Sequence, residues 1–271
     1  MKDLIIVRGG GDLATGTVYK LKKCGFPVLI LEISQPSAIR RNVAFCEAVY
    51  RGRHTVEDMT CCLADSPEQA AQFLQEGKLT ILVDPAGKSI GEMKPLAVVD
   101  AILAKKNLGT HRAMAPITVA LGPGFTAGGD VDAVIETCRG HDLGRVLWSG
   151  QAAPNTGIPG IIGGYGRERV IHAPAKGILR NVKKITDRVK KGEVIALVDT
   201  GTGTVPVTAT LDGLLRGLIR DCYPVKEGFK IADIDPRESE FDNCFTVSDK
   251  ARCIAGGVVE AILQLKKERG L

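Results

Sequence analysis

The first 121 residues alternate short apolar runs with segments of helical character, and this alternation limits the possible folds more than any other feature. Buried strands are predicted for the apolar runs at residues 3–8, 27–32, 79–84 and 117–121. Helices are predicted at residues 12–24, 66–76 and 95–106. Strands that alternate with helices of this length favour a parallel sheet covered on both faces. The pattern therefore predicts an α/β protein with an N-terminal Rossmann-like sheet.

A glycine-rich stretch, "VRGGGDLATG", lies between the first predicted strand and the first predicted helix. Gly9, Gly11 and Ala14 fit the G-x-G-x-x-A pattern, in which glycines let a phosphate approach the backbone at a helix N-terminus. Glu32 ends the next strand, where an acidic side chain can accept ribose hydroxyls. These features predict a nucleotide site. The alternative is a turn kept for sheet packing, and the Asp12 carboxylate would crowd a pyrophosphate.

Two further segments are expected at the carboxyl edge of the same sheet. Arg40 and Arg41 in "QPSAIRR" could bind an anion bidentately or pair with surface carboxylates. The segment "GPGFT" follows a strand and could form a second phosphate loop. The candidate cofactor-binding residues are Gly9, Gly10, Gly11, Asp12, Ala14, Thr15, Glu32, Arg40, Arg41, Gly122, Gly124 and Thr126.

The sequence assigns no catalytic residue and no metal site. It contains no Ser-His-Asp, paired-carboxylate or Walker pattern, and His141, although in a polar setting, is more simply structural. The eight cysteines include no C-x-x-C motif, and the four histidines lack ligand spacing. Most cysteines are expected to be small buried hydrophobes. The functional alternative is a thiol that handles sulfur or selenium. The role of the pair Cys61 and Cys62 stays open.

The remainder of the chain divides into three parts beyond a nucleotide-binding domain at residues 1–125. Glycine and proline dominate a connecting region at residues 126–168. Residues 169–237 contain a repeat, in which residues 173–199 match residues 209–235. This repeat resembles the biotinyl/lipoyl hammerhead, a barrel-sandwich hybrid of two related halves. Residues 238–271 are expected to form a helix that packs back on the body.

Several classes of partner and cofactor are excluded by composition. The hairpin "TGTGT" between the repeats lacks a lysine, so no biotin or lipoate is expected. The net charge of +5 is mild and aromatic residues make up only 4%, which argues against nucleic acid. No apolar run is long enough to span a bilayer, and no signal peptide is recognisable. A cytoplasmic location is therefore expected.

Taken together, the motifs resemble the YqeB family, accessory proteins of selenium-dependent molybdenum hydroxylase systems. The resemblance rests on "VRGGGDLATG", "QPSAIRRNVAF", "VDAILAKKN", "ALGPGFTAG", "VIETCRGHDLGRV", "NTGIPG", "LRGLI", "KIADIDPR" and "SDKAR". In some relatives this module is fused to an XdhC-like domain. The resemblance implies a maturation factor that binds a nucleotide or dinucleotide, such as a molybdopterin dinucleotide. Its partners would be a molybdenum hydroxylase or the proteins that mature its cofactor.

Two other functions remain open at this point. The chain could be an NAD(P)-dependent oxidoreductase, although no hydride-accepting site or positioned acid can be named. It could also be a scaffold whose Rossmann domain is empty. The chain could form a homo-oligomer in any of these cases, and the bound nucleotide is not identified by the sequence.

Overall fold

A computed structural model describes residues 1–155, 157 and 160–271 of the chain. The chain forms two compact units. The first unit consists of Met1–Pro36, Ala44–Thr156 and Val247–Leu271, and the second of Ser37–Val43 and Gly157–Thr246. Among the helices of the described part, none has the length and apolar character needed to cross a bilayer.

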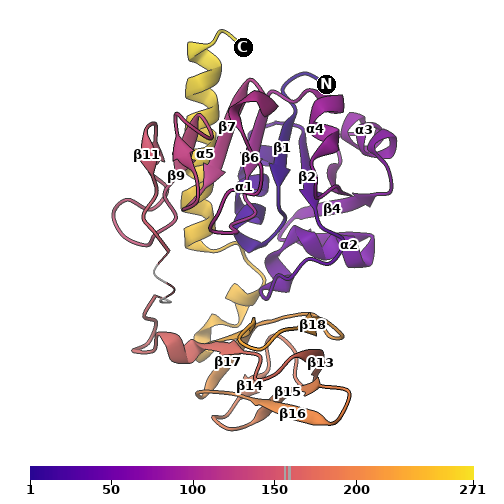
Figure 1. The fold of residues 1–271 in the computed structure, drawn as a ribbon, viewed down its shortest axis with the longest axis vertical. Helices are drawn as coiled ribbons and strands as arrows, with labels where there is room; N and C mark the ends of the chain where they lie inside the picture. Colours follow the sequence, from indigo (N-terminus) through magenta and orange to yellow (C-terminus); the bar gives the residue numbers. More distant parts are fainter. Residues whose placement is uncertain (156, 158–159) are drawn as a thin grey trace. The chain divides into compact units, whose positions relative to one another are not determined.

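The first unit is built on a nine-stranded sheet with the strand order β10-β9-β7-β6-β1-β2-β5-β4-β3 (Figure 1). Its strands are β1 (Ile5–Arg8), β2 (Val28–Glu32), β3 (Arg53–Val56), β4 (Met59–Ala64), β5 (Leu79–Val83), β6 (Ala97–Asp100), β7 (Ile117–Leu121), β9 (Ala133–Ile135) and β10 (Val146–Leu147). The strands from β9 to β4 are parallel, whereas β3 and β10 pair antiparallel at the two edges. A separate two-stranded sheet joins β8 (Thr126–Ala127) to β11 (Gly150–Gln151).

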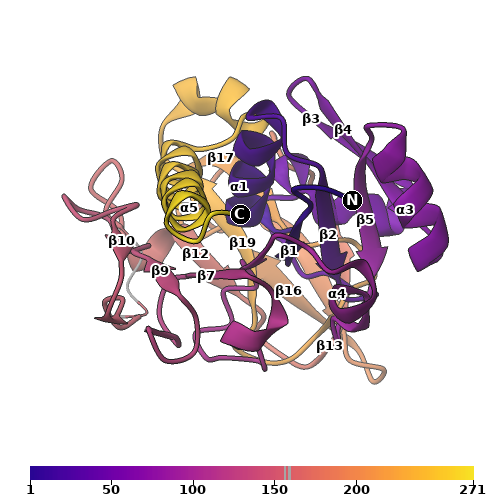
Figure 2. The ribbon, with the colours of Figure 1, turned by 90° about the horizontal axis from the view of Figure 1, so that it is seen from above.

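Helices cover both faces of this sheet. The helices are α1 (Asp12–Lys23), α2 (Ala48–Arg51), α3 (Pro67–Gln75), α4 (Lys88–Met93) and α5 (Asp249–Glu268), with short 3-10 turns η2 (Phe45–Glu47) and η3 (Arg112–Met114). Side chains of α3 and α4 pack with Leu4, Ile6 and Leu29 on one face. Helices α1 and α5 lie side by side on the other face (Figure 2).

Local sequence signals explain where two of the helices begin. The Ser66 hydroxyl accepts a hydrogen bond from the N–H of Gln69 at the start of α3, and Pro67 occupies the first helical position. The Ser248 hydroxyl likewise accepts from the N–H of Ala251 at the start of α5. Both helices were predicted from these caps, and both predictions are confirmed.

The predicted Rossmann-like parallel sheet is wrong, because the sheet is mixed and larger than expected. The sequence pattern missed the two short edge strands. Strand β3 pairs antiparallel with β4 across a tight turn at Glu57, and β10 pairs antiparallel with β9. The predicted helix at residues 95–106 is also wrong, since strand β6 lies there instead. Its four residues are buried on both faces, and such a short apolar run has no periodicity that separates strand from helix.

The second unit contains two four-stranded antiparallel sheets, ordered β12-β19-β17-β14 and β16-β15-β13-β18. Their strands are β12 (Val170–His172), β13 (Gly177–Asn181), β14 (Arg188–Val189), β15 (Val194–Asp199), β16 (Thr204–Thr208), β17 (Gly213–Leu218), β18 (Pro224–Val225) and β19 (Lys230–Asp235). Short 3-10 turns are η1 (Arg41–Val43), η4 (Arg167–Arg169), η5 (Glu238–Glu240) and η6 (Asp242–Cys244).

The sequence repeat is visible in these strands, but the predicted hammerhead is wrong. Strands β13, β14 and β15 of the first copy correspond in sequence position to β17, β18 and β19 of the second. Each sheet takes two long strands from one copy and a two-residue strand from the other. This exchange produces two separate sheets around a shared apolar core, rather than the single flattened barrel that the resemblance implies.

Candidate anion-binding site at the sheet edge

Five polar or glycine-rich segments meet at one edge of the first unit, because the strands that precede them are parallel neighbours. The glycine loop, residues 9–11, follows β1, and Glu32 ends β2 beside it. Loop 101–106 follows β6 on the other side of β1, and the second glycine loop, residues 122–124, follows β7 beyond it. The carboxyl end of β5 lies next to Glu32. The structure therefore places both glycine loops and Glu32 on one sheet edge.

The fold constrains the first two glycines of the glycine loop. Gly9 has a φ of +96°, and a Cβ there would lie 2.9 Å from the carbonyl oxygen of Ala101. A Cβ on Gly10 would lie 3.1 Å from the backbone nitrogen of Cys46, whose N–H donates to the Gly10 carbonyl. The backbone after β6 thus excludes a side chain at Gly9, and η2 leaves little room for one at Gly10.

Gly11 differs from its neighbours, because nothing in the fold requires a glycine there. Its φ of −64° and ψ of 179° suit any residue, and a Cβ would meet nothing within 4 Å. Gly11 is also the N-cap of α1, and no side chain caps this helix. Ser, Thr, Asp and Asn cap such a position with their side chains, and glycine is also common there. The helix N-terminus therefore has an open Cβ position at Gly11, and its N-cap residue supplies no capping side chain.

The Glu32 carboxylate is fixed against the glycine loop by two backbone groups. Its Oε2 accepts from the N–H of Gly10 at 2.8 Å, and its Oε1 accepts from the N–H of Ile33 at 2.8 Å. Burial raises the pKa of Glu32 above its ordinary value, against these two hydrogen bonds, which lower it. Each oxygen keeps a further lone pair. The carboxylate can therefore still accept hydrogen bonds from hydroxyl groups.

Lys250, in the first turn of α5, reduces the objection that Asp12 would repel a phosphate. Helices α1 and α5 approach closely, since a Cβ on Gly16 would lie 2.7 Å from the Cβ of Ala251. Burial lowers the pKa of Lys250, as does the charge of Arg139, whereas the negative charge of Asp12 raises it. A cation near Asp12 thus comes from a residue that the sequence reasoning missed. The only signal for it was its place in the "SDKAR" motif.

Two of the predicted binding residues serve the packing of α1. Ala14 and Thr15 are fully buried. The Thr15 hydroxyl donates to the carbonyl of Gly10 at 3.4 Å and accepts from the N–H of Phe45 at 2.9 Å. The Thr15 hydroxyl therefore links the glycine loop to η2. Contact between the backbone groups of Ala14 and Thr15 and a ligand stays a prediction.

A buried cluster of three polar side chains lies next to the glycine loop. Arg8, the last residue of β1, is 4% exposed and donates to the hydroxyl of Thr110 at 2.5 Å. Thr110 in turn donates to the Asp100 carboxylate at 2.5 Å, and Arg8 lies 3.8 Å from the same carboxylate. Burial raises the pKa of Asp100, although Thr110 and Arg8 lower it. Arg8, Thr110 and Asp100 thus connect the end of β1, just before Gly9, to the end of the neighbouring strand β6.

The second glycine loop is shaped by its own neighbours. Gly122 has a φ of +75°, and a Cβ there would lie 2.6 Å from the hydroxyl of Thr137. Gly124 has a φ of +106°, and a Cβ there would lie 2.7 Å from the backbone of Lys106. The Thr126 hydroxyl accepts from the side-chain amide of Gln151 at 2.9 Å. Both glycines of this loop are thus explained by backbone geometry and close packing, and a role in phosphate binding stays a prediction.

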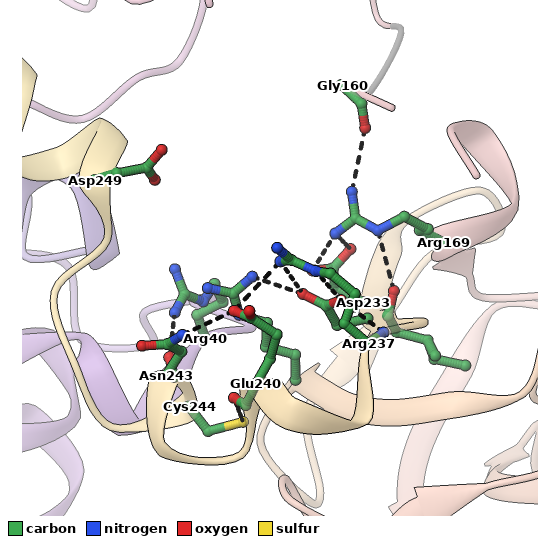
Figure 3. A network of polar contacts seen from close by, with 12 residues as sticks. Arg40, Gly160, Arg169, Asp233, Arg237, Glu240, Asn243, Cys244 and Asp249 are labelled. Atoms are coloured by element: carbon green, nitrogen blue, oxygen red, sulfur yellow. Dashed lines mark hydrogen bonds and ion pairs between the residues drawn. The ribbon is translucent and has the colours of Figure 1, made fainter. Parts of the chain in front are cut away.

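Arg40 and Arg41 belong to the second unit, where both contact backbone carbonyls. Arg40 donates to the carbonyl of Asn243 at 3.1 Å, and Arg41 donates to that of Leu218 at 2.7 Å. Figure 3 shows Arg40 in a network in which Arg169 donates to both oxygens of Asp233. Their proposed role in anion binding therefore stays a prediction, separate from the glycine loop.

Two buried carboxylates in this network differ in their titration. Burial raises the pKa of Asp233, although the charge of Arg169 lowers it. Burial acts in the same sense on Asp235, but hydrogen bonds from Arg237 and the charge of Arg216 bring its pKa below the ordinary value. Arg216 and Arg237 lie 2.9 and 2.8 Å from the same Asp235 oxygen. Asp235 thus holds the end of β19 to β17.

No metal centre emerges from the part of the chain that the structure describes, and burial raises the pKa of the Cys46 and Cys61 thiols. That part contains no group of three His, Cys, Asp or Glu residues that could hold a metal ion. Burial strongly raises the pKa of Cys46 beside the glycine loop, and the negative charges of Glu32, Glu47 and Asp12 add to this. Burial also strongly raises the pKa of Cys61. The "NTGIPG" motif lies partly outside the described residues.

Fold and site together define an α/β protein with a candidate anion-binding edge on its larger sheet. The chain is 52% identical over 263 residues to YqeB of Escherichia coli strain K12, described as an uncharacterized protein. The alignment covers 97% of this chain but 48% of that relative, so the chain spans about half its length. This identity supports membership of the chain in the YqeB family. No protein-family model matches the chain.

Several solved structures are distantly similar to this chain. An aspartoacylase family protein from Mesorhizobium loti is 10% identical, with a TM-score of 0.30 over 86% of this chain and 85% of that one. A succinylglutamate desuccinylase/aspartoacylase from Rhodobacter sphaeroides is 13% identical, with a TM-score of 0.30 over 87% and 86% of the two chains. The ectoine utilization protein EutE from Ruegeria pomeroyi has a TM-score of 0.24, with 13% identity over 86% and 57%. Similarity at this level supports no conclusion about function.

Proposed function

We propose that this chain is an accessory protein that binds the phosphate groups of a nucleotide-containing cofactor, and that its client is a molybdenum hydroxylase. The observation that supports the binding site best is Gly11. The fold has no need of a glycine at this position, but a ligand that approaches the N-terminus of α1 would need the space that a side chain would fill. The client is proposed from the family resemblance alone.

The arrangement suits phosphate in three respects. The first-turn N–H groups of α1 point along the helix axis and carry the positive end of its dipole. Lys250 adds a cation near Asp12. The Glu32 carboxylate lies beside the loop, where the sugar of a nucleotide would follow its phosphate. A molybdopterin dinucleotide combines these groups, and we propose it as the cofactor.

A binding experiment tests the site separately from the client. Inorganic pyrophosphate, NADP and cytidine diphosphate are titrated into the wild-type protein and into Gly11→Val by calorimetry. We expect at least one compound to bind the wild type, and Gly11→Val to lose that binding while its circular dichroism is unchanged. Absence of binding to the wild type at millimolar concentration would contradict the proposal. A thermal melt with the same compounds gives a second readout, because a ligand that binds the folded state raises its stability.

The client is tested in a strain that lacks this protein. We expect its molybdenum hydroxylase to be present but inactive, with incomplete cofactor, and activity to return with the wild-type gene but not with Gly11→Val. Normal activity of the molybdenum hydroxylase in that strain would contradict the proposed maturation role. Tight binding of NADP alone would then favour the oxidoreductase alternative.

A further inference from the structure

A pocket of about 540 Å³ lies in the second unit and shares no residue with the candidate anion-binding site. Residues 176–178, 199–201 and 224–226 line it, so it is formed around the start of β13, the end of β15 and strand β18. Small-molecule sites in proteins have volumes of about 300–1,000 Å³. The pocket can therefore hold a ligand of metabolite size.

The sequence repeat allows this pocket to be compared with an equivalent place in the same unit. Strand β13 of the first copy pairs with β18 of the second, and β17 of the second copy pairs with β14 of the first, in equivalent registers. We call these pairings the pocket crossing (β13 with β18) and the paired crossing (β17 with β14). Lys176 and Lys226 are the next residues on the two strands of the pocket crossing, and Asp212 and Lys190 are their equivalents at the paired crossing.

The paired crossing compensates its own charges. The Nζ of Lys190 lies 3.0 Å from Oδ2 of Asp212, which shows that side chains at these two register positions can reach one another. The Asp235 carboxylate ends β19 next to them in the fold and accepts hydrogen bonds from Arg216 and Arg237. Each acidic group of this crossing therefore has a cationic partner.

The pocket crossing has the opposite electrostatic character. Lys176 takes the place of Asp212, so two lysines occupy opposed positions and both line the pocket. Among the residues that the structure describes, none forms an ion pair with Lys176 or Lys226. Asp199 also lines the pocket, and its Oδ1 accepts from the N–H of Gly201 at 3.0 Å. Two ammonium groups and one carboxylate leave one positive charge in excess, and like charges at opposed positions are unfavourable.

The pocket crossing is also more open than its equivalent. Gly201 stands at the repeat offset from Arg237, whose side chain lies against Asp235 at the paired crossing. Ile178 is 36% exposed, whereas its equivalent Leu214 is 1% exposed, although each is the register partner of a strand-ending aspartate. The pocket therefore combines an exposed aliphatic wall with an excess of positive charge.

We propose that this pocket binds a small organic carboxylate, with the carboxylate between the ammonium groups of Lys176 and Lys226 and the aliphatic body on Ile178. The ligand carboxylate would act on these lysines as Asp212 acts on Lys190 at the paired crossing. The charge favours a carboxylate over a neutral compound, and the aliphatic wall favours a ligand with an apolar body over acetate. This site is separate from the glycine loop and does not rest on the proposed function.

The test titrates hexanoate, acetate and hexanol into the wild-type chain, with calorimetry and backbone N–H chemical shifts as readouts. We expect hexanoate to bind more tightly than either other compound and to shift the N–H signals of Lys176 and Lys226. Ile178→Ser should weaken hexanoate about three- to tenfold and leave acetate unchanged.

The decisive variant is Lys176→Asp, which copies the ion pair of the paired crossing into the pocket. Because the fold already accommodates that pair, the circular dichroism of this variant should equal that of the wild type. Its hexanoate affinity should fall by at least about fivefold. Lys184→Asp is the matched control, since it makes the same charge change at an exposed lysine of this unit that does not line the pocket. It should leave hexanoate affinity unchanged.

Several results would overturn the proposal. Hexanoate that does not bind at millimolar concentration would do so, as would acetate or hexanol that binds as tightly as hexanoate. Equal weakening by Lys176→Asp and Lys184→Asp would show an effect of net charge alone and would also overturn it. If Lys176→Asp changes the circular dichroism, Lys176→Gln and Lys184→Gln make the same comparison without adding a carboxylate. Nucleotide binding at the glycine loop is measured separately, so the proposed function stands or fails independently.

Discussion

Replacing Gly11 with serine tests whether this position is a glycine because a ligand needs the space or because the fold needs it. The backbone of Gly11 is already in the extended conformation typical of an N-cap, and its Cβ position is open. A serine there can cap α1, which is worth a few tenths of a kcal/mol over glycine. Fewer conformations in the unfolded chain add about 0.4–1 kcal/mol. We therefore expect Gly11→Ser to be more stable than the wild type by about 1 kcal/mol.

The assay is urea denaturation followed by circular dichroism, with nucleotide titration of the same samples. Gly11→Ser should gain about 1 kcal/mol in the free energy of unfolding and lose nucleotide binding. Gly9→Ser is the matched control in the same loop. Its φ of +96° and the carbonyl of Ala101 at 2.9 Å should cost about 1–3 kcal/mol. If Gly11→Ser is destabilised as much as Gly9→Ser, or if it still binds nucleotide, the reasoning about Gly11 is refuted.

Four other predictions concern two carboxylates, the packing of α1 on α5, and the hairpin between the repeats. Because burial raises the pKa of Glu32, the folded state binds more protons than the unfolded state between the ordinary and the raised pKa, so this group lowers stability as pH rises through that window. Glu32→Gln should remove that loss in a pH series of urea titrations while weakening nucleotide binding. Burial opposes ionisation of Asp132, but hydrogen bonds from Arg269 and Thr118 lower its pKa below the ordinary value. Its contribution to folding stability is therefore lost as pH falls through that lowered pKa. Asp132→Asn should cost about 2–3 kcal/mol at neutral pH, and the deficit should shrink in acid; a constant deficit would contradict this assignment. Gly16→Ala should destabilise α1 against α5, whereas Gly256→Ala, where a Cβ meets nothing within 4 Å, should gain up to about 1 kcal/mol in the same denaturation assay. Intact-mass measurement of protein from its own host should show no biotin or lipoyl addition; either mass increment would contradict the prediction from the lysine-free hairpin.

The sequence by itself determined those features that depend on neighbouring residues. Ser66 and Ser248 start α3 and α5 because a cap needs only a hydroxyl and the N–H groups of the next turn. The strand–glycine–helix order around residues 9–11 and the two-copy repeat were likewise readable from local pattern. So was the position of Glu32 at the end of a buried strand beside the loop.

Tertiary structure decided what pattern cannot express. Three consecutive glycines look alike in sequence, but Ala101 and Cys46, brought there by β6 and η2, constrain Gly9 and Gly10 and leave Gly11 open. Residues 97–100 became a strand because the centre of the sheet buries both of their faces. The antiparallel edges and the exchange of short strands between the repeats depend on partners distant in the chain. Lys250 interacts electrostatically with Asp12 because α5 packs on α1, and this packing requires that Gly16 has no side chain where Ala251 lies against it.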